Sequence, residues 1–303
     1  MKRFIYHLLL PAMFLSAGCT SESGPLSSPE EPVSLTASME DETRAVGTQW
    51  EVGDKIGVRV QGNNVTQYKN TQYTIKTGGP TGTLDYVSGQ KIYFRPNETY
   101  SVFAYYPFGG TVNNVNDLTV NTTSQVNQKA IDILGCLMSG VPNTQTSLNL
   151  RFKHYMARIV VVVKPGENMA FDVLKSVSLC FKSIKVQGKL KSDLSGIEPT
   201  GNAIEWSFTK NSSVQIDNNA KTLTYTLIVV PPLAGDSKSL TLESSNAGSK
   251  KTCTFSLARA AGTTQTVEVT VADEKLSVKV LSAVGGGENK VLWNDNSNVN
   301  IAL

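Results

Sequence analysis

The chain has 303 residues, of which 17% are charged, and its formal net charge is +3 at neutral pH. Lys2 and Arg3 belong to the extreme N-terminal segment, so the remainder of the chain is nearly neutral. A nearly neutral chain without a basic stripe argues against nucleic acid as a partner. The length exceeds what one hydrophobic core usually spans, which predicts two domains.

Residues 1–18 read as a signal peptide. A short basic region is followed by an apolar stretch from Phe4 to Leu15, which is too short for a membrane span. Small residues then precede Cys19, a pattern that resembles a bacterial lipobox and predicts a thiol that receives diacylglycerol. Acyl chains on Cys19 would hold the protein at a membrane surface. The alternative is an ordinary secretory signal in which this cysteine is incidental.

Residues 19–32 are rich in Ser, Pro and Glu and predict a solvated, disordered tether, because such a composition cannot form a core. A first strand follows, in which Val33, Leu35, Ala37 and Met39 alternate with polar residues. An acidic stretch then leads to Arg44 and Ala45. This stretch is either a protease-accessible loop or a solvated turn.

Alternating apolar residues, separated by Gly, Pro and Asn turns, continue through the first half and indicate a β-sandwich. The segment from Tyr100 to Pro107 is apolar on both faces, which predicts a central strand covered on both sides. The other predicted strands are centred on Ile56–Val60, Tyr73–Ile75, Leu84–Tyr86 and Ile92–Phe94. From Val112 to Thr146 the chain is rich in Asn and Thr and predicts a long loop with a short helix or strand.

The stretch Leu148–Val163 divides the chain. It predicts two strands, or one bent strand, with a polar interruption at Lys153–His154. We expect one β-domain to pass to the next here, giving domains at 33–146 and 147–303. The second half then repeats the alternation often enough for a second sandwich.

The C-terminus ends in three alternating apolar residues, Val299, Ile301 and Leu303, behind a triple glycine at 285–287. Chain termini are usually frayed and polar, so this pattern is informative. Two interpretations remain open. The strand completes its own sandwich, or residues 288–303 leave on the glycine hinge and pair with another subunit.

The residues offer no framework for catalysis, a cofactor or a metal. Outside the signal peptide the one histidine is His154, for which we expect a structural role bonded to a neighbouring loop. Cys136, Cys180 and Cys253 are widely spaced and allow at most one disulfide, and Cys253 alternates like a small core residue. None of the usual hydrolase, metalloprotease or nucleotide motifs occurs, so an enzyme is not expected.

Three motifs in a fixed order resemble the fimbrillin-like lipoproteins, the type V pilus subunits of anaerobic Gram-negative bacteria. The first is W-x-x-G-D-x-I-G-V, the second is F-A-Y-Y-P and the third is L-x-F-x-H-x-x-A-R. Their matching residues are Trp50, Gly53, Asp54, Ile56, Gly57, Val58, Phe103, Ala104, Tyr105, Tyr106, Pro107, Leu150, Phe152, His154, Ala157 and Arg158.

The resemblance implies an all-β protein with two transthyretin-like Greek-key β-sandwich domains in tandem. It implies a precursor lipidated at Cys19, carried to the outer membrane and incorporated in a fimbrium. A protease would cut between Arg44 and Ala45 and release the first strand. A donor strand from the next subunit, with Val299, Ile301 and Leu303 as candidates, would refill the groove. The function implied is a pilus subunit that serves adhesion to a surface receptor.

Two alternatives stay open at this point. One is a monomeric surface glycan-binding lipoprotein, which would keep its first strand and expose aromatic residues such as Tyr105, Tyr106 and Phe108. The other is a tip or anchor subunit of a pilus, in which only one end polymerises. The N-terminus of the mature protein separates a processed subunit from a tethered binder.

Overall fold

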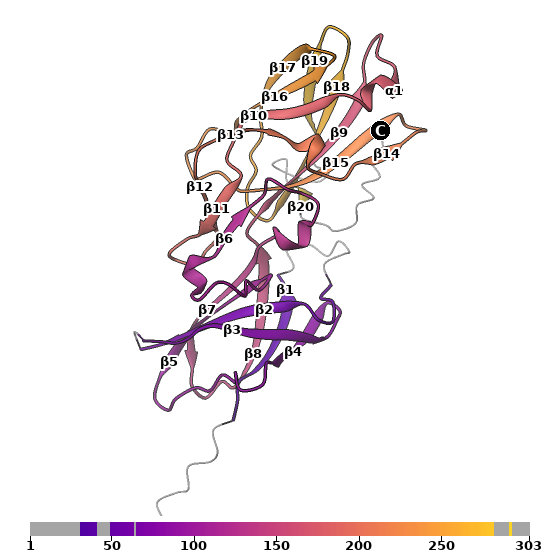
Figure 1. Ribbon diagram of the computed structural model, residues 1–303. Coiled ribbons are helices and arrows are strands. Elements are labelled where there is room, and N and C mark those ends of the chain that lie inside the picture. Colours follow the sequence, from indigo (N-terminus) through magenta and orange to yellow (C-terminus); the bar gives the residue numbers. More distant parts are fainter. Residues whose placement is uncertain (1–30, 41–48, 64, 282–290, 293–303) are drawn as a thin grey trace, which may run out of the picture. The chain divides into compact units, whose positions relative to one another are not determined.

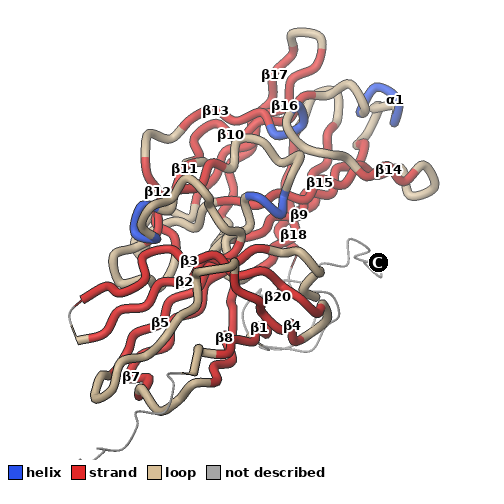
Figure 2. Tube along the Cα trace, turned by 60° about the horizontal axis from the view of Figure 1, so that its bottom comes forward, coloured by secondary structure: helices blue, strands red, loops and turns tan. Residues whose placement is uncertain are grey.

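Strands account for most of the computed structural model, which describes residues 31–40, 49–63, 65–281 and 291–292 (Figure 2). The predicted all-β class is confirmed. Pro32–Leu303 form one unit. Met1–Glu31 form another, which lies almost wholly outside the described residues. No helix among the described residues is long and apolar enough to cross a membrane.

The first half of the described chain forms one sheet that closes on itself in the order β1-β4-β3-β2-β5-β7-β8 (Figure 1). Its strands are β1 (Ser34–Met39), β2 (Lys55–Gly62), β3 (Val65–Thr77), β4 (Thr81–Tyr86), β5 (Thr99–Tyr106), β7 (Leu134–Pro142) and β8 (Ser147–His154). Alternate residues such as Val58, Val60 and Leu150 point into its core, as period-two patterning requires. The seam between β7 and β8 is closed by two residue pairs only.

The predicted first sandwich is therefore a ring of strands with a short seam. β8 belongs to this ring, because it pairs with β1 and β7. The predicted division before Ser147 would cut the ring, whereas the pairing pattern changes after His154. The domain limits and the transthyretin-like Greek-key order stay predictions.

The segment between β5 and β7 holds more structure than one helix or strand. It contains two 3-10 helices and a strand, which are η1 (Val115–Asp117), β6 (Thr119–Asn121) and η2 (Gln128–Ala130). β6 pairs with β11 (Gln187–Leu190), which in turn pairs with β12 (Ile197–Thr200). This three-stranded sheet joins a segment of the first half to the second half.

Apart from β11 and β12, the strands of the second half form two sheets that share one hydrophobic core. One sheet has β13 (Ile204–Ser207), β10 (Ser178–Ile184), β16 (Ser239–Asn246) and β17 (Ser249–Ser256) in that order. The other has β14 (Gln215–Asp217), β15 (Thr222–Val229), β9 (Ala157–Pro165), β18 (Thr263–Val271) and β19 (Leu276–Leu281), with β20 (Val291–Leu292) also on β18. Short helices α1 (Phe171–Leu174) and η3 (Phe208–Lys210) complete the elements.

β5 serves two cores at once. Val102 and Ala104 lie in the core of the ring, whereas Phe103 and Tyr105 lie in a separate cluster that includes Tyr155 and residues of the second half. The prediction that this strand is covered on both faces is confirmed. The outer face of the ring is thus apolar where the second half covers it.

Candidate functional site: the first strand in its slot

β1 lies between two neighbours, with β8 along its whole length and β4 along half of it. It runs parallel to β8 over six residue pairs, from Ser34 with Ser147 to Met39 with Phe152. It runs antiparallel to β4 over three pairs. The strand therefore fills a slot in the ring between β4 and β8.

The inward face of β1 supplies part of the ring's core. Val33, Leu35 and Ala37 are buried within the same apolar cluster as the residues of β8. Full burial of a Val or Leu side chain contributes about 1.5–3 kcal/mol. Removal of this strand would open the core as well as two backbone ladders.

The outward face of β1 is polar and held by one side chain of β8. The hydroxyls of Thr36 and Ser38 donate to Asn149 Oδ1 over 3.3 Å and 3.1 Å. At the two ends, Ser34 N–H donates to the carbonyl of Thr146 and Glu40 N–H donates to that of Phe152, each over 2.7 Å. Sequence patterning indicated the strand but not its partner, because a parallel neighbour far along the chain leaves no local signal.

The segment that contains Arg44 and Ala45 lies between β1 and the rest of the ring in the sequence. β1 ends at Met39, and paired backbone resumes at Trp50, whose N–H donates to the carbonyl of Gly79 over 3.0 Å. Arg44 and Ala45 themselves lie outside the described residues, as do Cys19, Val299, Ile301 and Leu303. Their proposed roles stay predictions.

The three family motifs meet at one end of the ring. Trp50 contacts Tyr106 and Phe152 edge-on, with ring centroids 5.6 Å and 5.1 Å apart. Tyr106 Oη donates to Asp54 Oδ1 over 3.2 Å. Burial, followed by the charge of Asp54, raises the pKa of Tyr106 well above its usual range, so this hydroxyl stays protonated. These contacts give the motif residues a role in closing the ring.

A glycine of the first motif makes room for a tyrosine of the second. Gly57 and Tyr105 are directly opposite in the β2–β5 ladder. A Cβ on Gly57 would lie 2.1 Å from Tyr105 Cε1. Tyr105 is itself fully buried and its hydroxyl donates to Asn70 Oδ1 over 3.1 Å. Tyr105 is therefore not exposed as a sugar-stacking surface.

The third motif joins the two halves. His154 Nδ1 lies 3.1 Å from Asp132 Oδ1, in the loop after η2, which confirms the structural role predicted for this histidine. Arg158 is buried and its Nε donates to Thr264 Oγ1 of β18 over 2.9 Å. Ala157 lies in the core of the second half, whereas Leu150 and Phe152 lie in that of the ring.

Reactive chemistry is not favoured at the described cysteines. Cys136, Cys180 and Cys253 are unbridged. Burial raises the pKa of Cys136 to about 11, and burial together with nearby Glu205 raises that of Cys180 to about 11. Because the thiolate is the nucleophile, both are inert near neutral pH. Across the described ranges, no group of three or more metal-ligating side chains comes together.

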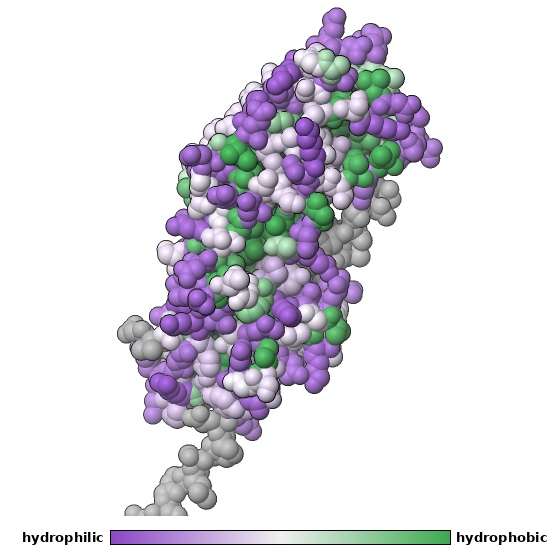
Figure 3. Space-filling view, in the orientation of Figure 1, coloured by the Kyte–Doolittle hydropathy of each residue, from purple (hydrophilic) through white to green (hydrophobic). Residues whose placement is uncertain are grey.

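On the face seen in Figure 3 the surface is largely hydrophilic, with apolar side chains gathered over α1 and β14 and again near β6. The exposed apolar residues of the first group are Val173 on α1, Ile216 on β14 and Val214, which precedes β14. β14 has one strand neighbour, β15. Nothing else in this region marks a binding site.

Residues 43–285 match the family model described as fimbrillin-like. In curated proteins, "Putative fimbrium subunit Fim1C" of Bacteroides uniformis is 28% identical over 170 residues, which cover 54% of this chain and 56% of that protein. The match thus spans little more than half of the relative's length.

Solved structures share the fold. A "putative cell adhesion protein" from Bacteroides ovatus aligns with a TM-score of 0.64 at 18% identity, over 88% of this chain and 100% of that chain. Another of the same description, from Bacteroides uniformis, aligns with a TM-score of 0.61 at 22% identity, over 82% and 96%. The family match extends over most of the chain and includes all three motifs. The chain belongs to the fimbrillin-like family.

Proposed function

We propose that this protein is a fimbrial subunit that is exported as a lipoprotein, lipidated at Cys19, and polymerised by exchange of β1 for a strand of its neighbour. Its place would be the outer membrane before assembly and the fimbrium afterwards. Its partners would be other pilus subunits, and its role would be adhesion. The observation that carries the proposal is the position of β1 in the slot between β4 and β8.

Loss of β1 creates a defined vacancy. The N–H and C=O groups of β8 and β4 that now pair with β1 would lose their partners, and the core would open at Val33, Leu35 and Ala37. An extended strand with alternating apolar residues satisfies both needs at once. A buried slot of this kind resists occupation by water or by a polar loop.

Processing at Arg44 and Ala45 would release the strand. Both residues follow β1 and precede Trp50, so a cut there separates the strand covalently from the rest of the ring. After the cut, β1 is held only by its two ladders and its core contacts. Its departure then depends on competition from another strand.

The C-terminal segment supplies a donor of suitable pattern. Val299, Ile301 and Leu303 alternate at the same spacing as Val33, Leu35 and Ala37. They follow β20, which is attached to β18 by two residue pairs. A tail from one subunit in the slot of the next is a head-to-tail contact, and such contacts build filaments.

Two variants of the full chain test the proposal in the native host. Arg44→Ala should abolish processing and leave lipidated monomers, as shown by N-terminal sequencing and by electrophoresis without boiling. Arg95→Ala is the matched control, because Arg95 is an exposed loop arginine outside residues 41–48. Polymers that form normally from Arg44→Ala would contradict the release of β1 at this position.

Truncation after Gly287 tests the donor separately. It removes residues 288–303 and leaves the slot and the processing segment intact. Processed monomers without polymers are expected. Polymers that survive this deletion would exclude the donor role of Val299, Ile301 and Leu303.

A further inference from the structure

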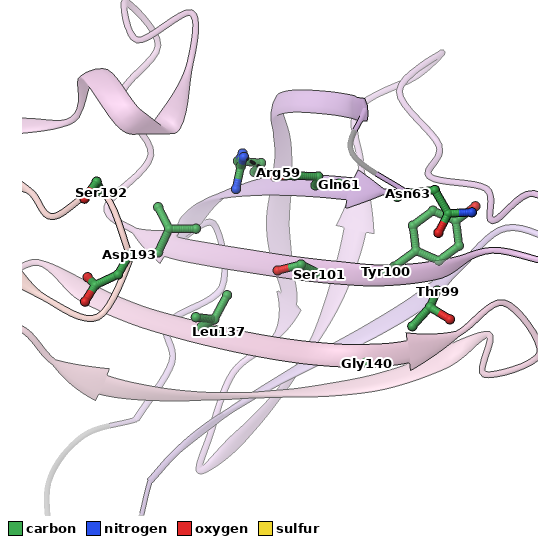
Figure 4. Close-up of a pocket in the computed structure, with 12 residues that line it drawn as sticks. Arg59, Gln61, Asn63, Thr99, Tyr100, Ser101, Leu137, Gly140, Ser192 and Asp193 are labelled. Carbon is green, nitrogen blue, oxygen red and sulfur yellow. Dashed lines mark hydrogen bonds between the residues drawn. The ribbon is translucent and has the colours of Figure 1, made fainter.

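The outer face of the ring carries a polar groove at the border of the region that the second half covers (Figure 4). It has a volume of about 490 Å³ and lies over β2, β5 and β7. Arg59, Gln61, Ser101 and Leu137 point outward from these strands, opposite the core residues Val60 and Val102. The small side chain of Ser101 leaves space above β5 in this groove.

The loop between β11 and β12 forms one wall of this groove, through Ser192, Asp193 and Leu194. The loop is fixed in place, since Tyr155 Oη donates to the carbonyl of Leu194 over 2.7 Å and Leu194 is buried. Asp193 Oδ1 accepts from both N–H and Oγ of Ser195. Because this loop is already held in place, a ligand that binds here does not incur the entropic cost of ordering it.

Arg59 is a cation without a counter-ion at the centre of the groove. No carboxylate of the described residues lies within ion-pair distance of its guanidinium, whose Nη2 donates to Gln61 Oε1 over 2.5 Å. Its Nε is buried and has no acceptor. Burial lowers the pKa of Arg59, yet the group remains charged at any physiological pH. A guanidinium in this state has unused capacity for a planar anion.

The two ends of the groove are polar. Asp193 lies at the loop end, and Asn63, Thr99 and Tyr100 line the other end. Carboxylate, amide and hydroxyl groups suit the hydroxyls of a ligand, while the central arginine suits one carboxylate. A run of acidic peptide residues would meet repulsion from Asp193.

A peptide has a second disadvantage here. β2 and β5 are paired on both sides within the ring, and β7 is paired with β5, so the backbone across the floor of the groove has its partners. Within the described residues, the edge of β7 that is unpaired beyond Gly135 is the one away from β5. Over the floor, recognition must come from side chains, which here are hydroxyls, amides, a guanidinium and the 41% exposed side chain of Leu137. This set matches the hydroxyls and the apolar face of a sugar ring.

We propose that this groove binds a carboxylate-bearing carbohydrate, with the sugar carboxylate on Arg59 and sugar hydroxyls on Ser101, Gln61 and Asp193. The inference rests on the adhesive part of the proposed function and is independent of strand exchange. It names the chemical class to which the subunit adheres.

The test is a calorimetric titration of the purified full chain with a hyaluronan tetrasaccharide, in which glucuronate alternates with N-acetylglucosamine. Saturable binding is expected, and the same oligosaccharide with its carboxylates reduced to alcohols should bind at least about tenfold more weakly. Arg59→Gln should weaken binding at least about tenfold, which corresponds to about 1.4 kcal/mol. Lys69→Gln makes an equal change of charge at an exposed position of β3, outside the residues that line the groove, and should leave affinity unchanged.

A second variant keeps the test independent of charge and folding. Ser101→Trp fills the groove without altering the charge and should abolish binding, while thermal unfolding checks that each variant is folded. The proposal is overturned by absence of binding, by equal losses in Arg59→Gln and Lys69→Gln, or by tighter binding of tetraglutamate than of the sugar. Binding by a chain that does not polymerise would support it, and strand exchange would then be judged by the Arg44→Ala and truncation variants alone.

Discussion

The indole of Trp50 lies edge-on against the ring of Phe152, with centroids 5.1 Å apart and planes at 72°. Trp50 precedes β2, and Phe152 is on β8, next to the slot that holds β1. The contact therefore joins the residue at which paired backbone resumes after residues 41–48 to the strand against which β1 lies.

Trp50→Ala should lower the free energy of unfolding by about 3–5 kcal/mol, because a large buried ring is replaced by a cavity between Tyr106 and Phe152. Urea denaturation followed by circular dichroism measures the change. Val52→Ala is the control two residues away, where the side chain is 72% exposed and the expected change is within about 0.5 kcal/mol. Similar values for both variants would contradict the packing role of Trp50.

Gly57→Ala should destabilise the ring by about 1–3 kcal/mol, since its methyl group would overlap the ring of Tyr105, which is buried and cannot move aside. Thermal unfolding gives the result. Gly110→Ala is the matched control, because its Cβ would meet its nearest atom, in Phe108, at 3.7 Å. Equal melting temperatures for the two variants would show that the ladder shifts without cost.

Gln125→Ala should cost more than an ordinary polar substitution. The buried amide of Gln125 accepts from Ile228 N–H over 2.7 Å and donates to the carbonyl of Ile228 over 2.9 Å. These bonds satisfy the backbone N–H and C=O of Ile228 on β15, on the edge that β14 covers only at the other end of the strand. Their loss leaves a buried donor and an acceptor unpaired, at about 1–3 kcal/mol for each.

Gln125→Glu provides the sharper comparison. A carboxylate can still accept from Ile228 N–H but cannot donate to the two carbonyls that Nε2 serves, those of Thr122 and Ile228. It should be at least as destabilising as Gln125→Ala in urea denaturation. Full stability of Gln125→Glu would show that the amide bonds contribute nothing.

Stability should fall at alkaline pH through Cys136. Burial raises the pKa of this thiol to about 11 from an ordinary value of 9.0. Between these values the unfolded chain has lost the proton and the native chain retains it, so unfolding becomes easier as pH rises. Two pKa units correspond to a contribution on the order of 2–3 kcal/mol that is present below pH 9 and lost by pH 11.

The measurement compares the native protein with Cys136→Ala in urea at pH 8 and pH 10. Other groups also titrate in this range, so the informative quantity is the difference between the two proteins. The native protein should lose more stability than the variant between these pH values. Parallel losses would show that Cys136 does not carry this pH dependence.

The β1 slot can be tested in a folded, full-length chain. Replacing residues 41–48 by the recognition sequence of a specific protease allows β1 to be cut loose after folding. A labelled peptide of residues 32–40 should then exchange into the slot, whereas the same peptide with Leu35→Asp should not, since it places a charge in the core. Native electrophoresis follows the label. Equal uptake of both peptides would contradict a slot that selects apolar side chains.

Local patterning predicted most strands of this protein because one face of each is buried. β5 is the clearest case, as its apolar residues on both faces predicted that both would be covered. The stretch Leu148–Val163 was predicted as two strands or one bent strand, and it holds β8 and β9 with a break after His154, while the domain limits stay predictions. Sequence alternation does not report which distant strand is the neighbour, and β1 and β8 are more than a hundred residues apart.

Polar residues were harder to predict than apolar ones. Gln125 lies in an Asn- and Thr-rich stretch that reads as loop, although its amide completes the edge of β15. Arg59 stands among the alternating residues of a strand and carries no motif. Their roles depend on what lies across from them in space, and the sequence carries that information only once the fold is known.

The parallel pairing of β1 with β8 along its whole length has a mechanical consequence. In a fimbria assembled as proposed, traction on the filament would pull the inserted strand along its own axis. The six parallel rungs then share the load together instead of opening one after another from an end. Separation then requires the whole strand to slide at once. An interface made from one short strand could therefore withstand a force that would separate two strands pulled apart from one end.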